Sequence, residues 1–175
     1  MKTLFCLVSL TCLLTACATM TPQECQTADW QRVGFADALG GKNILLAEHQ
    51  QACTSVKITP DRQAYMNGYN AGAVQYCTYD KGLEVGKSGL SKSDTCNTPA
   101  LAANFQRGYE RGYKMHSKQS EIDTKQQRLA EIDTQLDKVR NNKQPMTAQE
   151  VDLLYREKDV LKQEIELLKK ELALL

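Results

Sequence analysis

A seven-residue repeat of apolar residues near the C-terminus is the feature that most limits how this 175-residue chain can fold. Leucine recurs at every seventh position, and a second row of mostly apolar residues lies three positions ahead of it. The two rows are Leu154, Leu161, Leu168 and Leu175, and Val151, Lys158, Ile165 and Leu172. This spacing gives the d and a positions of a coiled coil on one face of a helix. The segment is therefore expected to form a long helix that packs against a partner helix.

A second heptad segment lies upstream, with the same alternation at Ile122, Lys125, Leu129, Ile132, Leu136 and Val139. Residues 141–145 break the helix, and Thr147 with Glu150 forms a capping box that starts the next one. Two heptad helices joined by a short break predict an antiparallel coiled-coil hairpin over residues 117–175. The seam is expected to consist of Val151, Leu154, Leu161, Ile165, Leu168 and Leu172. A seam shared with a second subunit is the alternative, because Lys158 at an a position weakens a self-contained core.

The N-terminus has the pattern of a secretion signal. Lys2 is followed by an apolar run from Leu4 to Leu14 and then by small residues. A membrane-spanning helix needs about 20 apolar residues, so this run is too short to be one. Residues 1–16 are therefore expected to be a signal peptide that is removed.

The end of this segment has the pattern of a bacterial lipobox, Leu14, Thr15, Ala16 and Cys17. Small residues suit the peptidase, and the Cys17 thiol is the group that can receive the thioether-linked lipid. Residues 17–22 would then be a lipidated tether that anchors the protein without spanning the membrane. Because Ala18 rather than aspartate follows Cys17, the expected location in a proteobacterium is the outer membrane, on its periplasmic face.

Of the seven cysteines, Cys6 and Cys12 would leave with the signal peptide and Cys17 would carry the lipid. Four are left to pair, namely Cys25, Cys53, Cys77 and Cys96. In an oxidising compartment they predict two disulfides, with three possible pairings. We favour Cys25–Cys53 and Cys77–Cys96, because each closes a short loop and would stabilise the fold by about 3 kcal/mol. A zinc site is disfavoured because the chain has no C-x-x-C pair and neither histidine has ligand spacing to the cysteines. No metal and no cofactor is expected.

The region 23–116 is predicted to be a small disulfide-bonded helical domain. Helices are expected over residues 29–39, 44–53, 59–76 and 98–141, with Thr59-Pro60 and Thr98-Pro99 as start signals. The glycine-containing stretch 78–98 is expected to be a loop with at most a short helical turn. Sustained apolar–polar alternation is absent from the sequence, so the fold class is all-α: this domain, a long helix and the hairpin.

The domain contains an internal repeat in which an aromatic residue is followed by glycines at helical spacing. The clearest copies are Tyr65, Gly68, Tyr69 and Gly72, and Phe105, Gly108, Tyr109 and Gly112. A third copy is Tyr79, Gly82, Leu83 and Gly86, and a looser one is Trp30, Gly34, Phe35 and Ala38. Glycine costs about 1 kcal/mol in a helix interior, so its repetition on one face predicts a close neighbour. We expect these two helices to pack together, with the rings of one over the glycines of the other. An aromatic groove for a glycan or peptide is the alternative.

These features together resemble a family of uncharacterised bacterial lipoproteins, which is known as a domain of unknown function. The resemblance covers about Cys25 to Tyr113 and rests on the lipobox, the cysteines, the segment from Gly82 to Gly89 and Phe105-Gln106-Arg107-Gly108-Tyr109. Members often carry a charged helical extension like the one here. The resemblance implies an envelope location and disulfides, and it implies no reaction.

Composition and motifs limit the function further. The formal net charge is +1, which argues against a nucleic-acid reader. No nucleophile triad, phosphate-binding loop or metalloprotease motif stands out in the sequence. The leading hypothesis is a non-enzymatic structural or protein-interaction module, with an envelope protein or a second copy bound through the coiled coil. The alternative is a periplasmic module that binds glycan or peptidoglycan fragments through exposed tyrosines such as Tyr69, Tyr109 and Tyr113.

Overall fold

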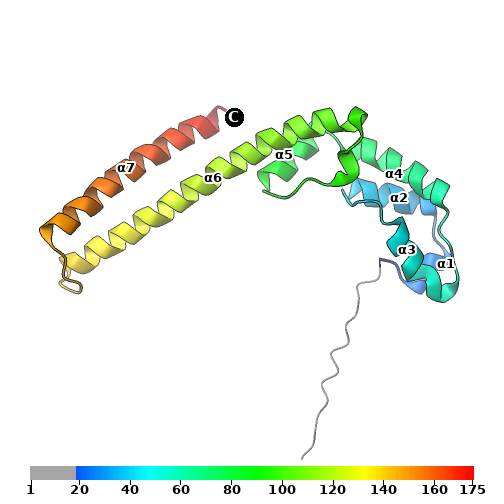
Figure 1. Cartoon of the computed structure of the whole chain (residues 1–175), viewed down its shortest axis with the longest axis horizontal. Helices are drawn as coiled ribbons and strands as arrows, with labels where there is room; N and C mark the ends of the chain where they lie inside the picture. The colour runs from blue at the N-terminus through cyan, green and yellow to red at the C-terminus, as the bar shows by residue number, and fades with distance from the viewer. Residues whose placement is uncertain (1–18) are drawn as a thin grey trace, which may run out of the picture.

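The computed structural model describes residues 19–175, so the predicted signal peptide, the lipobox and Cys17 lie outside the described residues. Over that range the chain is helical and contains no strand, which confirms the all-α class (Figure 1). The α-helices are α1 (Pro22–Gln26), α2 (Trp30–Leu39), α3 (Leu46–Ala52), α4 (Arg62–Tyr76), α5 (Tyr79–Lys87), α6 (Pro99–Arg140) and α7 (Ala148–Ala173). Two short 3₁₀ turns, η1 (Cys53–Val56) and η2 (Asp94–Cys96), lie just after α3 and just before α6.

Helices α2 and α4 form one tightly packed pair, and α5 and α6 form another. In the first pair Gln31 and Phe35 face Gly68 and Gly72, so residue numbers rise together along both helices. In the second pair Tyr79 and Leu83 face Gly108 and Gly112 in the same way. Each pair is therefore parallel, and the chain must cross back between the two helices.

The contacts in these pairs are close enough to involve the backbone. A Cβ added at Gly68 would lie 1.8 Å from the Gln31 carbonyl oxygen, and one added at Gly108 would lie 2.0 Å from that of Tyr79. Real Cβ atoms do not approach so closely, so only glycine permits this spacing of the helices. The helix propensity lost at these positions is thus a consequence of helix packing.

The two pairs are structural copies of each other. Gly34 packs on the Tyr65 carbonyl in the first pair, just as Gly82 packs on that of Phe105 in the second. Each pair also has one disulfide, and each disulfide joins the segments that precede the two helices. The bonds are Cys25–Cys53 and Cys77–Cys96, the pairing that the sequence predicted. The repeat seen in the sequence is therefore a repeat of a parallel, disulfide-closed helix pair.

Two predictions about this region were wrong. Residues 79–87 form helix α5 rather than a loop, with the Thr78 side chain accepting from the Lys81 N–H at its start. Its glycines suggested a break, but they are the surface on which α6 packs. The expected pairing of the glycine faces of α4 and α6 was also wrong, because each faces the preceding helix of its own pair. The contacts are made to backbone carbonyls rather than to aromatic rings, although Tyr76 and Phe105 do stack across the two pairs at 5.7 Å.

Helix ends differ in detail from the sequence expectations. Helix α4 begins at Arg62 and is capped by Asp61, so Thr59 is not its cap. Helix α6 begins at Pro99 as predicted, but the Thr98 side chain makes no capping hydrogen bond. Helix α1 was not predicted, and it begins at Pro22, the last residue of the expected tether, with a capping box formed by Thr21 and Glu24.

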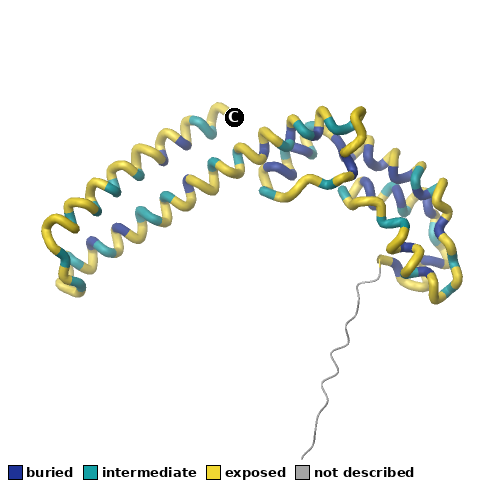
Figure 2. Tube along the Cα trace, in the orientation of Figure 1, coloured by how far each residue is buried: buried dark blue, intermediate teal, exposed yellow. Residues whose placement is uncertain are grey.

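Helix α6 continues far beyond the domain, and α7 folds back along it to form an arm (Figure 1). Both helices of the arm carry buried residues on the side that faces the other helix (Figure 2). These residues are Ile122, Ile132 and Leu136 in α6, and Ile165 and Leu168 in α7. Leu154, Leu161 and Leu172 are partly buried on the same face. The hairpin is therefore closed by its own seam, and Lys158 is accommodated by an ion pair with Asp133. Among residues 19–175 no helix has the length and apolar character needed to cross a bilayer.

Candidate functional site

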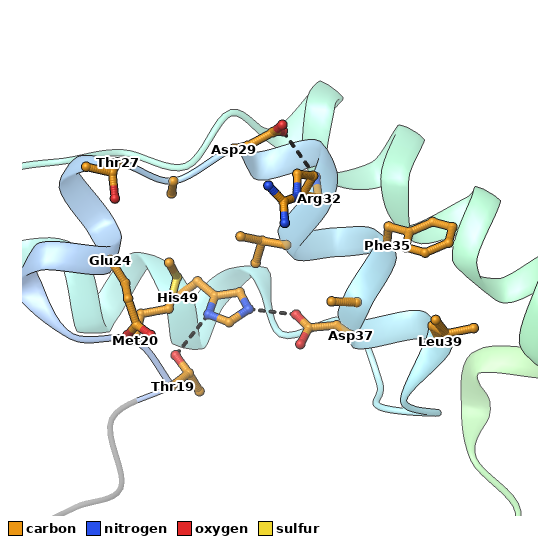
Figure 3. A pocket seen from close by; sticks show the side chains of 13 residues that line it. Thr19, Met20, Glu24, Thr27, Asp29, Arg32, Phe35, Asp37, Leu39 and His49 are labelled. Atoms are coloured by element: carbon orange, nitrogen blue, oxygen red, sulfur yellow. Dashed lines mark hydrogen bonds and ion pairs between the residues drawn. The ribbon is translucent and has the colours of Figure 1, made fainter.

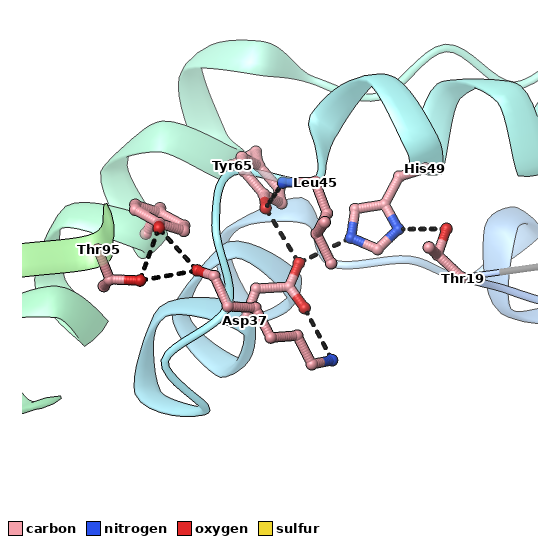
Figure 4. Close-up of polar contacts among 8 residues, drawn as sticks. Thr19, Asp37, Leu45, His49, Tyr65 and Thr95 are labelled. Atoms are coloured by element: carbon pink, nitrogen blue, oxygen red, sulfur yellow. Dashed lines mark hydrogen bonds and ion pairs between the residues drawn. The ribbon is translucent and has the colours of Figure 1, made fainter. Parts of the chain in front are cut away.

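The most elaborate polar cluster of the domain is centred on Asp37, a carboxylate that is only 4% exposed. Helix α2 carries Asp37 on its buried side, facing α3 and α4 (Figure 4). Its Oδ2 atom accepts from the Tyr65 hydroxyl at 3.0 Å and from His49 Nε2 at 2.7 Å. Its Oδ1 atom accepts from Lys42 Nζ at 3.3 Å. A buried charge requires such partners, and here three donors from different elements converge on one carboxylate.

His49 extends this cluster to the first residues that the structure describes. The imidazole is 3% exposed, and its Nδ1 lies 3.0 Å from Thr19 Oγ1. An ionised carboxylate can only accept, so Nε2 holds the proton shared with Asp37. In a neutral ring, Nδ1 is then the acceptor for the Thr19 hydroxyl. Thr19, His49 and Asp37 thus form a continuous hydrogen-bonded chain from the N-terminal segment into the core.

An open cleft of about 710 Å³ lies over this chain (Figure 3). Helix α2 forms one wall, and the segment before α1 together with His49 of α3 forms another. The lining mixes apolar side chains, such as Met20 and Phe35, with charged ones, such as Arg32 and Glu24. Met20 is 9% exposed and belongs to the hydrophobic core. Met20, three residues after the predicted lipid site, is therefore packed into the domain.

A hydroxyl, an imidazole and a carboxylate in this order can activate a nucleophile in hydrolases. In this chain these hydrogen bonds hold separate segments together, because Thr19 is bonded to His49, while His49 and Tyr65 are bonded to Asp37 of α2. Thr19 comes from the N-terminal segment, His49 from α3 and Tyr65 from α4. The Tyr65 hydroxyl also accepts from the Leu45 N–H at 3.0 Å. The cluster consequently holds the crossing segment of the first helix pair in place.

A second cluster joins the two helix pairs through the Lys42 carbonyl. The Tyr69 hydroxyl donates to this oxygen at 2.7 Å, and the Thr95 hydroxyl donates to it at 2.8 Å (Figure 4). Thr95 lies next to Cys96, so the disulfide of the second pair is tied to the crossing segment of the first. Burial raises the pKa of Tyr65, Tyr69 and Tyr76 above the ordinary tyrosine value. The hydroxyls of Tyr65 and Tyr69, which donate hydrogen bonds here, therefore keep their protons to a higher pH.

The tyrosines proposed as ligand contacts have unequal exposure. Tyr69 is 5% exposed and is occupied by the hydrogen bonds just described. Tyr113 is 49% exposed, and its ring stacks on that of Tyr109 with centroids 5.8 Å apart. Lys92 Nζ lies 5.5 Å from the centroid of Tyr109. The ring face available at the surface is therefore that of the Tyr109–Tyr113 stack.

Sequence reasoning found the cysteines, the glycines and the heptads, and it missed the cluster at Asp37. Asp37 and His49 are 12 residues apart and belong to different helices, so no local spacing relates them. One signal was present in the sequence, because Asp37 is a single acid within the apolar stretch from Phe35 to Leu39. An acid on the inward face of a short helix needs a buried partner.

Residues 29–114 match the model of a family described as a protein of unknown function, DUF2799. The match begins at Asp29, which caps α2, and ends at Lys114 in α6, so it covers both helix pairs and ends before the arm. No curated protein and no solved structure matches the chain.

Proposed function

We propose that this chain is a lipoprotein of the bacterial outer membrane that is anchored through Cys17 on the periplasmic face and acts as a non-enzymatic protein-interaction module. The observation that carries the proposal is the arm. Helix α6 has 42 residues, which is about 63 Å at 1.5 Å per residue, and most of its length lies beyond the disulfide-bonded domain. A long projection with a closed seam has no evident role in stabilising that domain. Its extended outer surface suits contact with another protein.

The N-terminal contacts support the anchoring part of the proposal. Thr19 is hydrogen-bonded to His49, and Met20 is packed in the core, so at most one residue separates Cys17 from the folded domain. A lipid on Cys17 would hold this end of the domain at the membrane surface. The arm leaves the domain from its other end, at α5 and α6 (Figure 1). Anchored in this way, the protein would present the arm away from the lipid attachment point.

The anchoring is tested with the full chain and its Cys17→Ser variant in a bacterial host. We expect the parent to incorporate labelled palmitate and to fractionate with the outer membrane. The variant should lose the label and accumulate as precursor, because serine has no thiol to form the thioether. A variant that still fractionates with the membrane after normal processing would contradict the lipoprotein assignment. Cys25→Ser with Cys53→Ser is the matched control, since it removes two other cysteines and should leave labelling intact.

The interaction role is tested by photo-crosslinking in cells from a reactive amino acid placed on the arm. Leu167 on the outer surface of α7 is 58% exposed and should give protein crosslinks. Ile165 is 4% exposed within the seam and should give links to α6 of the same chain. Absence of any intermolecular product from the exposed positions of both α6 and α7 would contradict the proposal.

A second candidate function is glycan binding, which the Tyr109–Tyr113 stack favours. Two stacked rings with a neighbouring ammonium offer an apolar face and a hydrogen-bond donor to a sugar. The test is an NMR titration of the protein with soluble peptidoglycan fragments. Saturable shifts that are lost in Tyr113→Ala would support this candidate, and shifts of equal size in that variant would reject it.

A further inference from the structure

The outer surface of α7 carries an apolar stripe that the hairpin does not use. It consists of Leu153, Val160, Leu167 and Leu174, which recur at intervals of seven residues. These side chains are between 53% and 88% exposed. We call this set the outer stripe, to distinguish it from the seam that faces α6. Single exposed leucines are normal on protein surfaces, but a row in heptad register is the pattern that a second helix recognises.

Charged residues flank the outer stripe with opposite signs on its two sides. One flank lies three residues after each stripe position and holds Arg156, Gln163 and Lys170. The other lies four residues after each stripe position and holds Glu157, Glu164 and Glu171. Corresponding members of the two flanks are adjacent in the sequence, so they lie at nearly the same height along the helix.

This charge pattern selects both the partner and its direction. When two copies of α7 meet through the stripe in parallel, the two-fold axis runs along the helices, and the basic flank of each faces the acidic flank of the other. In an antiparallel arrangement the axis is perpendicular, so like flanks face each other and repel. A row of glutamates beside the stripe also disfavours insertion into an anionic lipid surface. The complementary pattern is therefore that of a second copy of this chain in parallel orientation.

The glutamates remain available for such contacts although each already has a partner in α6. Glu157, Glu164 and Glu171 pair with Arg128, Lys125 and Lys118. Their side chains are 40%, 47% and 44% exposed, so part of each carboxylate faces outward. The ion pairs with α6 also fix the position of this acidic flank relative to the stripe. Arg156 is 76% exposed on the opposite flank and can reach across a parallel interface.

We propose that the outer stripe is the interface of a parallel homodimer of the arm. Four apolar side chains per copy make a small interface, so the dimer in solution is weak. Anchoring of both copies in one membrane, which rests on the proposed function, raises their effective concentration and requires the parallel direction. The pairing itself uses only residues of α7 and does not depend on the lipid.

The orientation is tested with single cysteines in the purified mature chain, residues 17–175, that carries Cys17→Ser. Its four other cysteines are all in disulfides, so the introduced thiol is the reactive one. In a parallel dimer Leu153→Cys should crosslink to itself, and so should Leu174→Cys. Crosslinking that occurs only in a mixture of the two variants would show an antiparallel dimer and overturn the proposal. Tyr155→Cys is the matched control, being half exposed on the same helix but off the stripe.

The interface is tested by sedimentation equilibrium of variants that keep the fold. Val160→Asp with Leu167→Asp changes two exposed residues and should raise the dissociation constant about tenfold or more, with an unchanged helical signal. Arg156→Glu with Lys170→Glu should weaken the dimer in the same direction, because like charges then face each other. Absence of a concentration-dependent dimer in the parent chain, or equal crosslinking of Tyr155→Cys, would overturn the proposal. Loss of palmitate labelling alone would reject the anchoring and leave this result unaffected.

Discussion

The lack of a Cβ atom at particular glycines sets the distance between paired helices in this domain. Seven glycines, three in the first pair and four in the second, lie where an added Cβ would meet the backbone of the facing helix at 2.4 Å or less. These glycines are Gly34, Gly68, Gly72, Gly82, Gly86, Gly108 and Gly112. Backbone cannot move aside as a flexible side chain can, so an extra methyl group must separate the helices. The glycines are therefore required by packing rather than by backbone conformation.

Gly68→Ala should lower the free energy of unfolding by about 1–3 kcal/mol, the usual range for overpacking. Alanine is the better helix former by about 1 kcal/mol, but this gain is smaller than the strain of forcing α4 away from α2. Denaturant unfolding under oxidising conditions measures the difference. Val74→Ala on the exposed side of α4 is the control and should change stability by less than about 0.5 kcal/mol. A Gly68→Ala variant as stable as the parent would contradict the close packing.

Tyr65 makes stability depend on pH at the alkaline end. Burial raises its pKa in the folded state, whereas the unfolded chain titrates at the ordinary value of 10.0. Below that value both states are protonated, and stability is unaffected. Above it the unfolded state loses the proton first, so stability falls as pH rises, by up to about 1.4 kcal/mol per pH unit for each such group.

Tyr65→Phe should therefore show a shallower alkaline decline than the parent when urea midpoints are compared between about pH 9 and 11. The variant should also be less stable near neutrality by about 1–3 kcal/mol, because the Leu45 N–H loses its acceptor and Asp37 loses a donor. Tyr155→Phe on the exposed surface of α7 is the control and should follow the parent. If the stability of Tyr65→Phe falls as steeply with rising pH as that of the parent, other groups determine the loss of stability at alkaline pH.

At the scale of elements, the features predicted correctly from the sequence are those that depend on residues close together in the chain. The capping box of Thr147 and Glu150, the start of α6 at Pro99 and the heptads of α7 all involve residues within a few positions of one another. Helix α5 escaped prediction because Gly82 and Gly86 read as breakers when their neighbours in α6 are unknown. The parallel pairing and the cluster at Asp37 also depend on contacts between distant segments. A single sequence carries no direct signal for such contacts.

The arm offers a test of element stability. Ile165→Ala removes a side chain that is 4% exposed between α6 and α7, and it should cost about 2–5 kcal/mol within the hairpin. Hydrogen exchange should then speed up along α7, while the amides of α2 and α4 keep their protection. Leu161→Pro should have a larger effect on α7, because it also removes a backbone donor. Gln163→Ala on the exposed side is the control. Equal loss of protection in α2 would show that the arm and the domain unfold together.

Over residues 19–175 the molecule consists of two copies of one unit followed by a projection. Each unit is a parallel helix pair whose N-terminal ends are joined by a disulfide, and the second unit supplies the helix from which the arm is built. Parallel helices need a crossing connection, and the disulfide limits the freedom of that connection in the unfolded chain. Near the junction, α7 is held to the base of the arm by the ion pair of Lys118 with Glu171 and by the hydrogen bond of Arg111 to the Leu175 carbonyl.

Deletion of residues 117–175 should consequently leave a folded domain. Both disulfides and all seven close-packed glycines precede the cut. The Lys118–Glu171 ion pair lies wholly within the deleted residues, and the hydrogen bond that Arg111 of the domain loses to Leu175 is exposed, so it is worth about 0–1 kcal/mol. We expect cooperative unfolding and a melting temperature within about 10 °C of the parent, since 1 kcal/mol shifts a domain of this size by about 4–8 °C.

A shorter fragment that ends at Arg107 tests whether the domain survives the first deletion because its glycine contacts are intact, or because it tolerates any C-terminal cut. It keeps both disulfides but loses Gly108 and Gly112, on which α5 packs. The second helix pair should then lose its hydrogen-exchange protection, while α2 and α4 retain theirs because their contacts lie within the first pair. If the fragment ending at His116 also loses protection in α5, the arm is part of the core of the second pair. The domain and the arm would then be a single folding unit, and the boundary near residue 116 would be wrong.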